Sequence, residues 1–200
     1  MLIMSRIIWI FRLLLICLVL VAPVYAQTTE YVFVPESSVY VDGTSNSTPE
    51  WRVYATEIEG GITVSSDDPS VVQSVRLVVP ANMMKSRKSP IMDRGMYDAL
   101  QVKEHPNIIY ELTSTADLVM TSDTTFTLSA TGNLTIGPQT NEVSFPVEGT
   151  LKSDGSVHFK GSYTLLMTDY GLKPPSLMFG SLRTGNEVVV TAELIASPAN

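Results

Sequence analysis

The feature that most constrains this chain is an alternation of apolar and polar residues, with a period of two, along most of its length. Because successive side chains of a strand point to opposite faces, this period predicts strands with one buried face. The clearest runs cover residues 71–79, 125–136, 143–147, 157–167 and 187–194. Repeated strands with few helical segments favour a β-sandwich or a closed β-barrel.

Turn signals separate these runs at short intervals. Asp154-Gly155 lies between two alternating runs and predicts a hairpin with a tight mirror-image turn, in which glycine supplies the positive φ. The segments 67–70, Gly137-Pro138 and 184–186 predict further turns. The pair Gly60-Gly61, inside a strand-like run at 51–64, predicts a bulge or bend that lets a sheet curl.

One segment departs from the period of two. From Ile91 to Leu100 the apolar residues recur at three- and four-residue spacing, which predicts a short helix. Pro90 suits the start of a helix, and His105-Pro106 lies beyond its end. We expect this helix to cross one mouth of a barrel.

Residues 1–26 are interpreted as a secretory signal peptide. Arg6 and Arg12 provide positive charge, residues 13–22 are almost wholly apolar, and Val24-Tyr25-Ala26 offers the small residues of a cleavage site. We therefore expect the mature chain to begin at Gln27 and to act in the periplasm or outside the cell. Residues 27–200 are long enough for one domain with a substantial core.

Removal of the signal changes both the charge and the cysteine content. The loss of two arginines takes the formal charge from −7 to −9, and the single cysteine, Cys17, leaves with the same segment. The fold must then hold together without disulfides. A surface this acidic is expected to repel nucleic acid and anionic lipid headgroups. No segment of the mature chain is apolar for long enough to predict a membrane-spanning helix.

A series of short motifs carries a family resemblance. In chain order they are Asp42-Gly43-Thr44-Ser45-Asn46, Trp51, Met92 to Leu100, Glu104 to Ile108, Gly132 to Ile136, and Met167 to Leu172 followed by Pro174-Pro175. Together they resemble the YceI-like family of exported lipid-binding proteins over almost all of the mature chain. The resemblance implies an all-β fold, an antiparallel, extended lipocalin-like barrel of about eight strands with the short helix near a mouth. It further implies that residues 27–200 form a lipid-binding domain that holds a long isoprenoid chain.

The apolar faces of the expected strands and helix supply the candidate ligand site. We expect these side chains to line an apolar cavity: Val75, Leu77, Met92, Met96, Leu100, Ile108, Tyr110, Phe126, Leu128, Ala130, Phe145, Phe159, Tyr163 and Met167. Methionine fills irregular space and suits a pliable ligand, and seven methionines remain after the signal: Met83, Met84, Met92, Met96, Met120, Met167 and Met178. The segment 169–175 is expected to border the cavity mouth.

Neither catalysis nor a cofactor or metal is expected. His105 and His158 are the only histidines. A catalytic imidazole needs a nucleophile beside it and a carboxylate that orients it, and neither histidine lies in a sequence motif that supplies them. Asp67-Asp68 is interpreted as a solvated turn.

Two functions remain open at this point. The first is an exported, non-catalytic protein that holds a polyisoprenoid or quinone-like chain for carriage or sequestration. The alternative is a filled barrel that acts through its outer surface as an interaction or stress-response accessory, because a small barrel either fills with its own side chains or holds one ligand. Pairing of two copies into a homodimer is also left open.

Overall fold

The computed structural model describes residues 28–199 except residues 48 and 178–179, so the interpreted signal peptide, Cys17, Gln27 and Met178 lie outside the described residues. The described strands are β1 (Thr28–Phe33), β2 (Ser38–Ser45), β3 (Trp51–Ala55), β4 (Glu59–Ser65), β5 (Val71–Pro80), β6 (Met84–Lys85), β7 (Asn107–Leu112), β8 (Ala116–Asp117), β9 (Val119–Met120), β10 (Thr125–Ile136), β11 (Gln139–Leu151), β12 (Val157–Leu166), β13 (Ser176–Leu177) and β14 (Leu182–Pro198). The helical elements are η1 (Ala81–Met83), α2 (Pro90–Leu100) and η2 (Met167–Tyr170).

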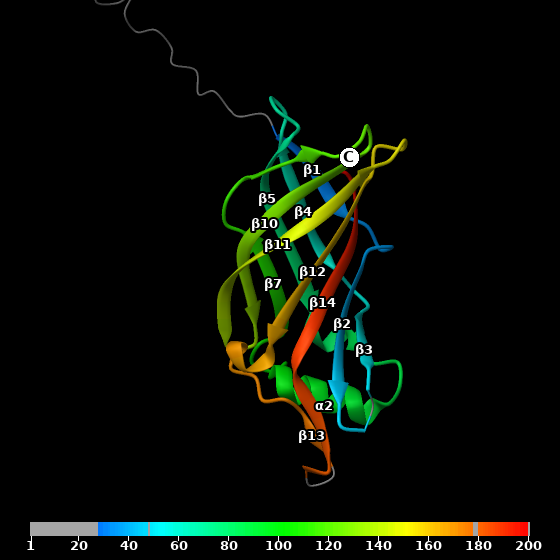
Figure 1. Ribbon diagram of the computed structural model, residues 1–200, viewed down its shortest axis with the longest axis vertical. Coiled ribbons are helices and arrows are strands. Elements are labelled where there is room, and N and C mark those ends of the chain that lie inside the picture. The colour runs from blue at the N-terminus through cyan, green and yellow to red at the C-terminus, as the bar shows by residue number, and fades with distance from the viewer. Residues whose placement is uncertain (1–27, 48, 178–179, 200) are drawn as a thin grey trace, which may run out of the picture.

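Eight strands form a closed antiparallel barrel. They pair in the order β1-β4-β5-β7-β10-β11-β12-β14, and β14 pairs again with β1, where Phe33 lies opposite Ala196. The hairpin of β2 and β3 extends the wall beyond this ring, because β2 pairs with β14 and β3 pairs with β6 (Figure 1). The expected antiparallel barrel of about eight strands is confirmed.

The strand-like run at 51–64 is two strands, not one. It breaks at residues 56–58, between β3 and β4, which lets β3 pair with β2 while β4 pairs with β1. The predicted bulge at Gly60-Gly61 is wrong, since the pairing of β4 with β5 stays in register there and shifts between Thr63 and Val64. The glycines serve close packing instead: a Cβ on Gly61 would lie 2.1 Å from the Tyr31 carbonyl oxygen.

The predicted hairpin at Asp154-Gly155 is present, but its turn differs from the prediction. The Lys152 N–H donates to the Ser156 oxygen and the Gly155 N–H to the Lys152 oxygen, and of the loop residues only Gly155 has a positive φ, of 84°. This is a three-residue loop that ends on a left-handed glycine, so it is not the two-residue mirror-image turn. A two-residue loop occurs at Gly137-Pro138, where Ile136 pairs with Gln139 and Gly137 has a φ of 55°.

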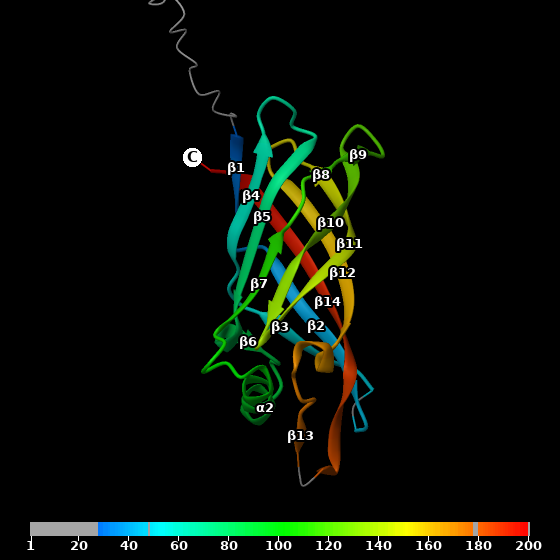
Figure 2. The ribbon, with the colours of Figure 1, turned by 90° about the vertical axis from the view of Figure 1, so that its left-hand side faces the viewer.

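The turn predicted at residues 184–186 is also wrong. These residues lie inside β14, the longest strand, and the irregularity there is a register shift in the pairing with β2 between Thr184 and Val188. A bulge lets the strand bend while it continues past the end of the barrel. The extended part of β14 pairs with β13 below the barrel (Figure 2).

The predicted helix is α2, and it lies across one end of the barrel (Figures 1 and 2). Its first turn begins at Pro90, and the Ser89 hydroxyl accepts a hydrogen bond from the Ile91 N–H at 3.2 Å. The proline and the Ser cap both satisfy the backbone requirements of a helix start. We call this end of the barrel the helix end and the opposite one the far end.

Aromatic packing fills the far end. The Phe126 ring is 2% exposed and lies over Gly149, its cross-strand partner, where a Cβ would be 2.0 Å from the ring. The Phe159 ring meets it edge-on with the centroids 5.9 Å apart. Ala196 is completely buried nearby, opposite Val157 and Phe33. The interior around Phe126, Gly149 and Ala196 is therefore closely packed.

Candidate ligand-binding cavity

The helix end encloses the larger of two described cavities, with a volume of about 280 Å³. Its walls come from the barrel strands on one side and from α2 on the other. The lining residues are Val39, Val41, Ser45, Ser47, Trp51, Val53, Val79, Met84, Ser86, Met92, Gly95, Met96, Ala99, Leu100, Ile108, Leu134, Ile136, Leu165, Met167, Leu172, Pro175, Leu182, Thr184, Val188 and Val190. The helix thus forms one wall of the cavity as well as spanning the mouth.

A second cavity of about 130 Å³ lies deeper in the barrel. Val39, Leu134 and Val190 line both spaces, so the two cavities are neighbours that meet at these three side chains. The remaining lining residues are Phe33, Ile62, Val72, Val75, Leu77, Tyr110, Leu112, Ala116, Leu128, Ala130, Phe145, Val147, Phe159, Gly161, Ser162, Tyr163, Ala192 and Leu194. Together the cavities define a path from the helix end toward the packed far end.

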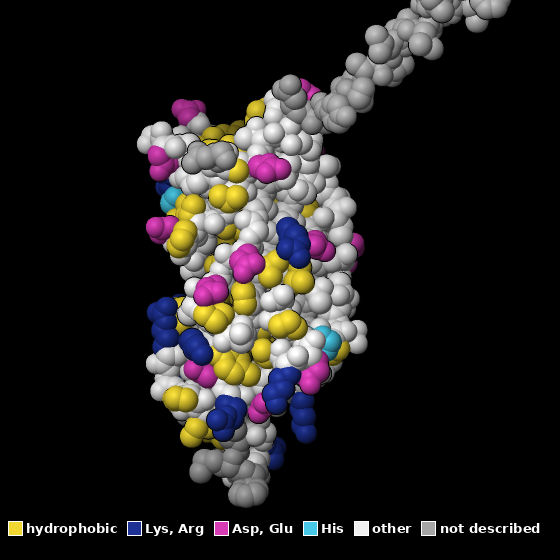
Figure 3. All heavy atoms as spheres, turned by 180° about the vertical axis from the view of Figure 1, so that it is seen from behind, with side chains coloured by type: hydrophobic (Ala, Val, Ile, Leu, Met, Phe, Trp, Pro, Cys, Tyr) yellow, Lys and Arg dark blue, Asp and Glu magenta, His cyan; other side chains and the backbone are white. Residues whose placement is uncertain are grey.

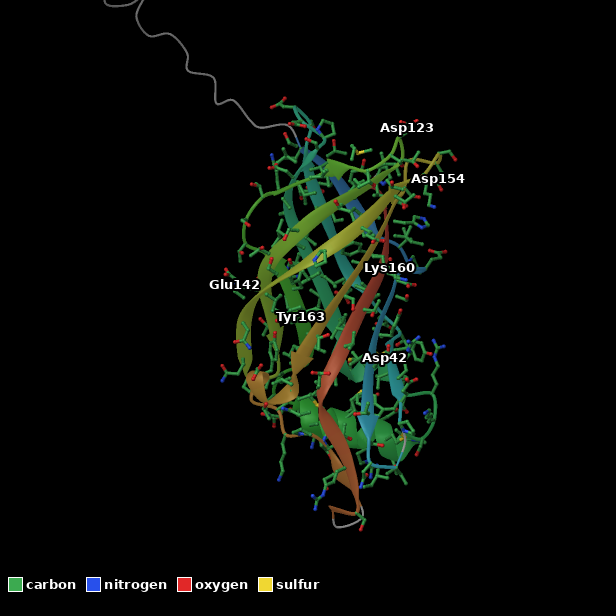
Figure 4. All side chains as sticks on the ribbon, in the orientation of Figure 1. Asp42, Asp123, Glu142, Asp154, Lys160 and Tyr163 are labelled. Atoms are coloured by element: carbon green, nitrogen blue, oxygen red, sulfur yellow. The ribbon has the colours of Figure 1, made fainter. Side chains whose placement is uncertain are left out.

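A row of aromatic rings borders the deeper cavity. Phe145 lies between Tyr110 and Tyr163, with ring centroids 5.6 and 5.9 Å away. Tyr163 projects from the middle of β12 (Figure 4). Burial raises the pKa of Tyr110 to about 12, and its hydroxyl has no hydrogen-bond partner among the described residues. The phenol therefore stays neutral at physiological pH and adds no charge to the wall.

The predicted cavity residues mostly surround these two spaces. Five line the outer cavity, namely Met92, Met96, Leu100, Ile108 and Met167. Eight line the deeper cavity, namely Val75, Leu77, Tyr110, Leu128, Ala130, Phe145, Phe159 and Tyr163. Phe126 is the exception and lines neither. Its side chain points inward as expected, but the ring lies in the space above Gly149 and belongs to the packed far end.

Several lining residues are absent from the predicted set, and Trp51 is the most informative of them. Its ring lies against Gly43, where a Cβ would be 2.2 Å from Trp51 Cζ2, and its Nε1–H donates to the Thr44 oxygen at 2.9 Å. Gly43 and Trp51 are cross-strand partners. Knowledge of this register would have placed the indole on the inner face; the alternation in a five-residue strand such as β3 is too short to do so.

Polar groups are few in the cavity walls and are unevenly placed. The outer cavity has the side chains of Ser45, Ser47, Ser86 and Thr184, whereas Ser162 is the only hydroxyl-bearing aliphatic residue lining the deeper one. The aliphatic hydroxyl groups thus lie chiefly toward the helix end, whereas the deeper cavity has the phenol groups of Tyr110 and Tyr163. The segment 169–175 contributes Leu172 and Pro175 to the wall of the outer cavity. A ligand with one polar end and one apolar end would match both cavities if its polar end lay in the outer cavity near the helix and its apolar end lay in the deeper cavity.

The remaining candidate residues for chemistry lie elsewhere. Neither His105 nor His158 lines a cavity. Asp68 is part of a turn, where its carboxylate accepts hydrogen bonds from the Ser70 N–H and hydroxyl, and these bonds lower its pKa. Within the described residues, no three His, Cys, Asp or Glu side chains gather closely enough to hold a metal ion. No helix in the described part of the chain has the length and apolar character needed to cross a membrane.

A sequence profile of the YceI-like domain matches residues 31–196, and the chain belongs to this family. The match covers nearly all of the described barrel. No curated protein sequence shows a significant match.

Several solved structures share the fold. A polyisoprenoid-binding domain from Saccharophagus degradans, implicated in plant cell wall breakdown, has a TM-score of 0.67 at 11% identity, covering 86% of this chain and all of that one. BcnA of Burkholderia cenocepacia has a TM-score of 0.60 at 12% identity, covering 80% of this chain and 96% of that chain. The YceI protein of Campylobacter jejuni has a TM-score of 0.52 at 13% identity, covering 74% and 84% of the two chains. At these identities the likeness concerns the fold.

Proposed function

We propose that this protein is an exported, non-catalytic lipid-binding protein that holds an apolar chain, such as a polyisoprenoid or a quinone tail, inside its barrel for carriage or sequestration. The observation that carries this proposal is the pair of adjoining apolar cavities, which share Val39, Leu134 and Val190. Apolar clefts of roughly 300 Å³ and more are typical of ligand sites. The likeness to a polyisoprenoid-binding domain supports the same chemistry.

The distribution of polar groups favours one orientation of the ligand. The apolar tail would enter first and extend toward Ala130 and Phe145, where Tyr110, Ser162 and Tyr163 are the polar side chains of an otherwise apolar wall. The polar end would stay near Ser86 and Thr184. Burial of a polar head at the deeper cavity would leave most of its hydrogen bonds unmade, because few polar side chains line that space, and this costs free energy.

Absence of catalysis is part of the proposal. Tyr110 and Tyr163 are the titratable groups that line the cavities. Burial raises the pKa of Tyr110 to about 12, so this phenol is a poor proton acceptor near neutrality. Export is also proposed, from the sequence of residues 1–26, and amino-terminal sequencing of the mature protein should begin at Gln27.

Titration with polyprenyl compounds tests the proposal. Trp51 lines the outer cavity and is the one tryptophan outside residues 1–26, so its emission should change saturably as the chain enters. Calorimetry should give the same midpoint. If neither signal appears with any chain length, the filled barrel that acts through its outer surface becomes the better explanation.

A matched pair of variants locates the binding. Ala99 lines the outer cavity from α2, whereas its neighbour Asp98 is exposed. Ala99→Phe should weaken polyprenyl binding at least about tenfold because the ring occupies ligand space. Asp98→Phe adds the same ring outside and should leave binding unchanged. Equal effects of the two substitutions would place the ligand elsewhere.

A further inference from the structure

The positive charges of this acidic protein are gathered at one end. Seven of the eleven Lys and Arg residues in the described chain lie on the segments around the cavity mouth, namely Lys85, Arg87, Lys88, Arg94, Lys103, Lys173 and Arg183. Figure 3 shows Lys and Arg side chains concentrated over the lower part of the molecule, the helix end, while Asp and Glu predominate above. Asp123 and Asp154 lie at the far end (Figure 4).

The cations of the barrel wall and those of the helix end differ in their partners. Arg52, Arg76 and Lys160 form ion pairs with Asp42, Glu111 and Glu193 at 2.6, 3.0 and 2.8 Å. None of the seven helix-end cations has a carboxylate oxygen within 4.0 Å among the described residues. The wall cations are thus neutralised within the fold, whereas the partners that the helix-end cations do have are neutral: Lys85 donates to the Tyr97 hydroxyl, Arg183 donates to the Gly180 oxygen, and Arg87 lies over the Tyr54 ring. Their positive charge is therefore not balanced by a paired carboxylate.

The densest group surrounds the start of α2, and we call Arg87, Lys88, Ile91 and Arg94 the basic corner. All four residues are exposed, and Ile91 has an exposed fraction of 69%, the highest among the large apolar side chains described as exposed. The acidic residue within this segment, Asp93, accepts a hydrogen bond from the Ser86 N–H at 2.8 Å. A bulky apolar side chain among cations is the pattern of a surface that enters the interface of an anionic bilayer.

The far end provides an internal contrast. It also exposes large apolar residues, Val119 at 61% and Met120 at 51%, but these neighbour Asp117 and Asp123 in the chain. An anionic surface would repel that end and attract the basic corner. The two ends therefore differ in charge and not in the presence of exposed apolar groups.

We propose that the helix end docks on the surface of an anionic phospholipid bilayer, with Ile91 entering the headgroup region and Arg87, Lys88 and Arg94 near the lipid phosphates. This inference rests on the proposed function, because docking would bring the cavity mouth against the membrane that supplies or receives the lipid. Met92, beside Ile91, already lines the outer cavity. The ligand could then pass between bilayer and barrel without its tail crossing water.

The net charge of the protein does not oppose this docking. Strand β11 has 13 residues, at a rise of about 3.3 Å each, and it runs from the helix end to the far end. The far-end carboxylates are thus several times the Debye length, about 8 Å at physiological ionic strength, from a membrane at the helix end. The segments around the mouth also have acids, namely Glu50, Asp93, Asp98, Glu104, Asp169 and Glu187. The clearest excess of positive charge is in segment 87–94, where Arg87, Lys88 and Arg94 are accompanied by one acid, Asp93.

Vesicle co-sedimentation of the mature protein tests the docking. Vesicles of phosphatidylcholine with about one third phosphatidylglycerol should bind the protein, those of phosphatidylcholine alone should not, and raised salt should weaken the binding. Each reversed cation should lower the partition coefficient about fivefold or more. The triple variant R87E/K88E/R94E should therefore lose about 100-fold. Ile91→Ser should also weaken binding.

Lys152→Glu is the matched control, because Lys152 is exposed in the β11–β12 loop at the far end and its reversal changes the net charge without touching the basic corner. It should bind vesicles as the parent does. Equal losses in Lys152→Glu and in a single basic-corner reversal, or no preference for anionic vesicles, would overturn the proposal. A requirement for a protein partner would appear as failure of the parent to bind any vesicle and would overturn it as well.

The docking and the lipid-binding function fail in different ways. The triple variant should still bind a polyprenyl compound by calorimetry, since its substitutions are exposed and lie outside both cavities. Charge-dependent vesicle binding by a parent that binds no polyprenyl chain would support the docking and contradict the lipid-binding function. Polyprenyl binding with no vesicle binding would do the reverse.

Discussion

Ala130→Phe separates an open cavity from a packed core. Ala130 is 6% exposed, faces the barrel interior between Leu128 and Gly132, and lines the deeper cavity of about 130 Å³. An apolar cavity of about 150 Å³ accommodates benzene in a protein core. The phenyl ring should therefore enter existing space with little displacement of its neighbours, and the ligand-free melting temperature should stay within about 2 °C of the parent.

Ala196→Phe is the control that shows how far the same ring lowers the melting temperature when it overpacks a filled region. Ala196 is completely buried and lines neither cavity. The same ring there must overpack a filled region, at a cost of about 1–3 kcal/mol. For a domain of this size, that cost lowers the melting temperature by about 2 to 12 °C.

Paired melting curves with and without a polyprenyl ligand give the result. Ala130→Phe should melt like the parent without ligand and should lose most of the ligand-induced rise, because the ring occupies the volume the tail would fill. If Ala130→Phe is destabilised as much as Ala196→Phe, the deeper cavity is not available to a ligand and the reasoning from its volume is wrong.

Three further substitutions test separate parts of the cavity. Val190→Phe narrows the junction of the two cavities, so calorimetry should show at least about tenfold weaker binding of long chains and little change for short ones; equal losses would contradict a continuous path. Gly43→Ala places a Cβ 2.2 Å from the Trp51 ring, whereas at Gly161 the nearest atom is 3.2 Å away. Gly43→Ala should lower the melting temperature by several degrees and shift the indole emission, and Gly161→Ala should have a smaller effect. Equal melting temperatures of the two variants would refute the close packing of Trp51 on Gly43. Tyr110→Phe removes a buried hydroxyl without a partner among the described residues and should raise stability by about 1–3 kcal/mol. The folded pKa of Tyr110 is about 12 against 10.0, so the unfolded chain loses the phenol proton at a lower pH than the folded protein does. The free energy of unfolding should therefore fall as pH rises from 10 to 12. Tyr110→Phe should show a smaller fall over that range, and parallel pH curves of the two proteins would contradict this.

Alternation along the chain was enough to predict strands with one buried face and most of the inward positions. The choice of a barrel over a sandwich came from the family resemblance. The apolar positions of β10, from Phe126 to Ile136, all point inward, because a strand fixes the face of every second side chain. The helix could also be predicted, since apolar residues recur at three- and four-residue spacing after Pro90. These features depend on local geometry that a few neighbouring residues determine.

The positions of Phe126, Trp51 and residues 184–186 depend on which residues pair across neighbouring strands, and this pairing could not be predicted from the sequence. Phe126 faces inward, yet it lines no cavity because Gly149, 23 positions away, leaves room for its ring. Trp51 lies in the cavity wall for the same reason, through Gly43. Likewise, the residues at 184–186 have turn-forming composition but lie in β14, since pairing with β2 continues on the far side of a register shift. Tertiary pairing overrides the local preference in such cases.

The distribution of charge over the surface also depends on the fold and could not be predicted from the sequence. The sequence gives a strongly acidic mature chain, from which repulsion of anionic lipid headgroups was expected. The fold brings together cations from separate segments, such as Lys88, Lys103 and Lys173, at one end. Net charge therefore describes the whole surface poorly when the ends of a long barrel are several Debye lengths apart.

Native mass spectrometry of the protein purified from its own host, without detergent, tests the lipid-binding function most directly. A lipid held in the two adjoining cavities should survive gentle purification, so the folded protein should carry a discrete mass excess that disappears on denaturation. Extraction with organic solvent should release a compound with a long apolar tail, and the emptied protein should take up a polyprenyl chain again. Folded protein with only the polypeptide mass, together with no uptake of any polyprenyl chain by calorimetry, would contradict the function proposed for the cavity.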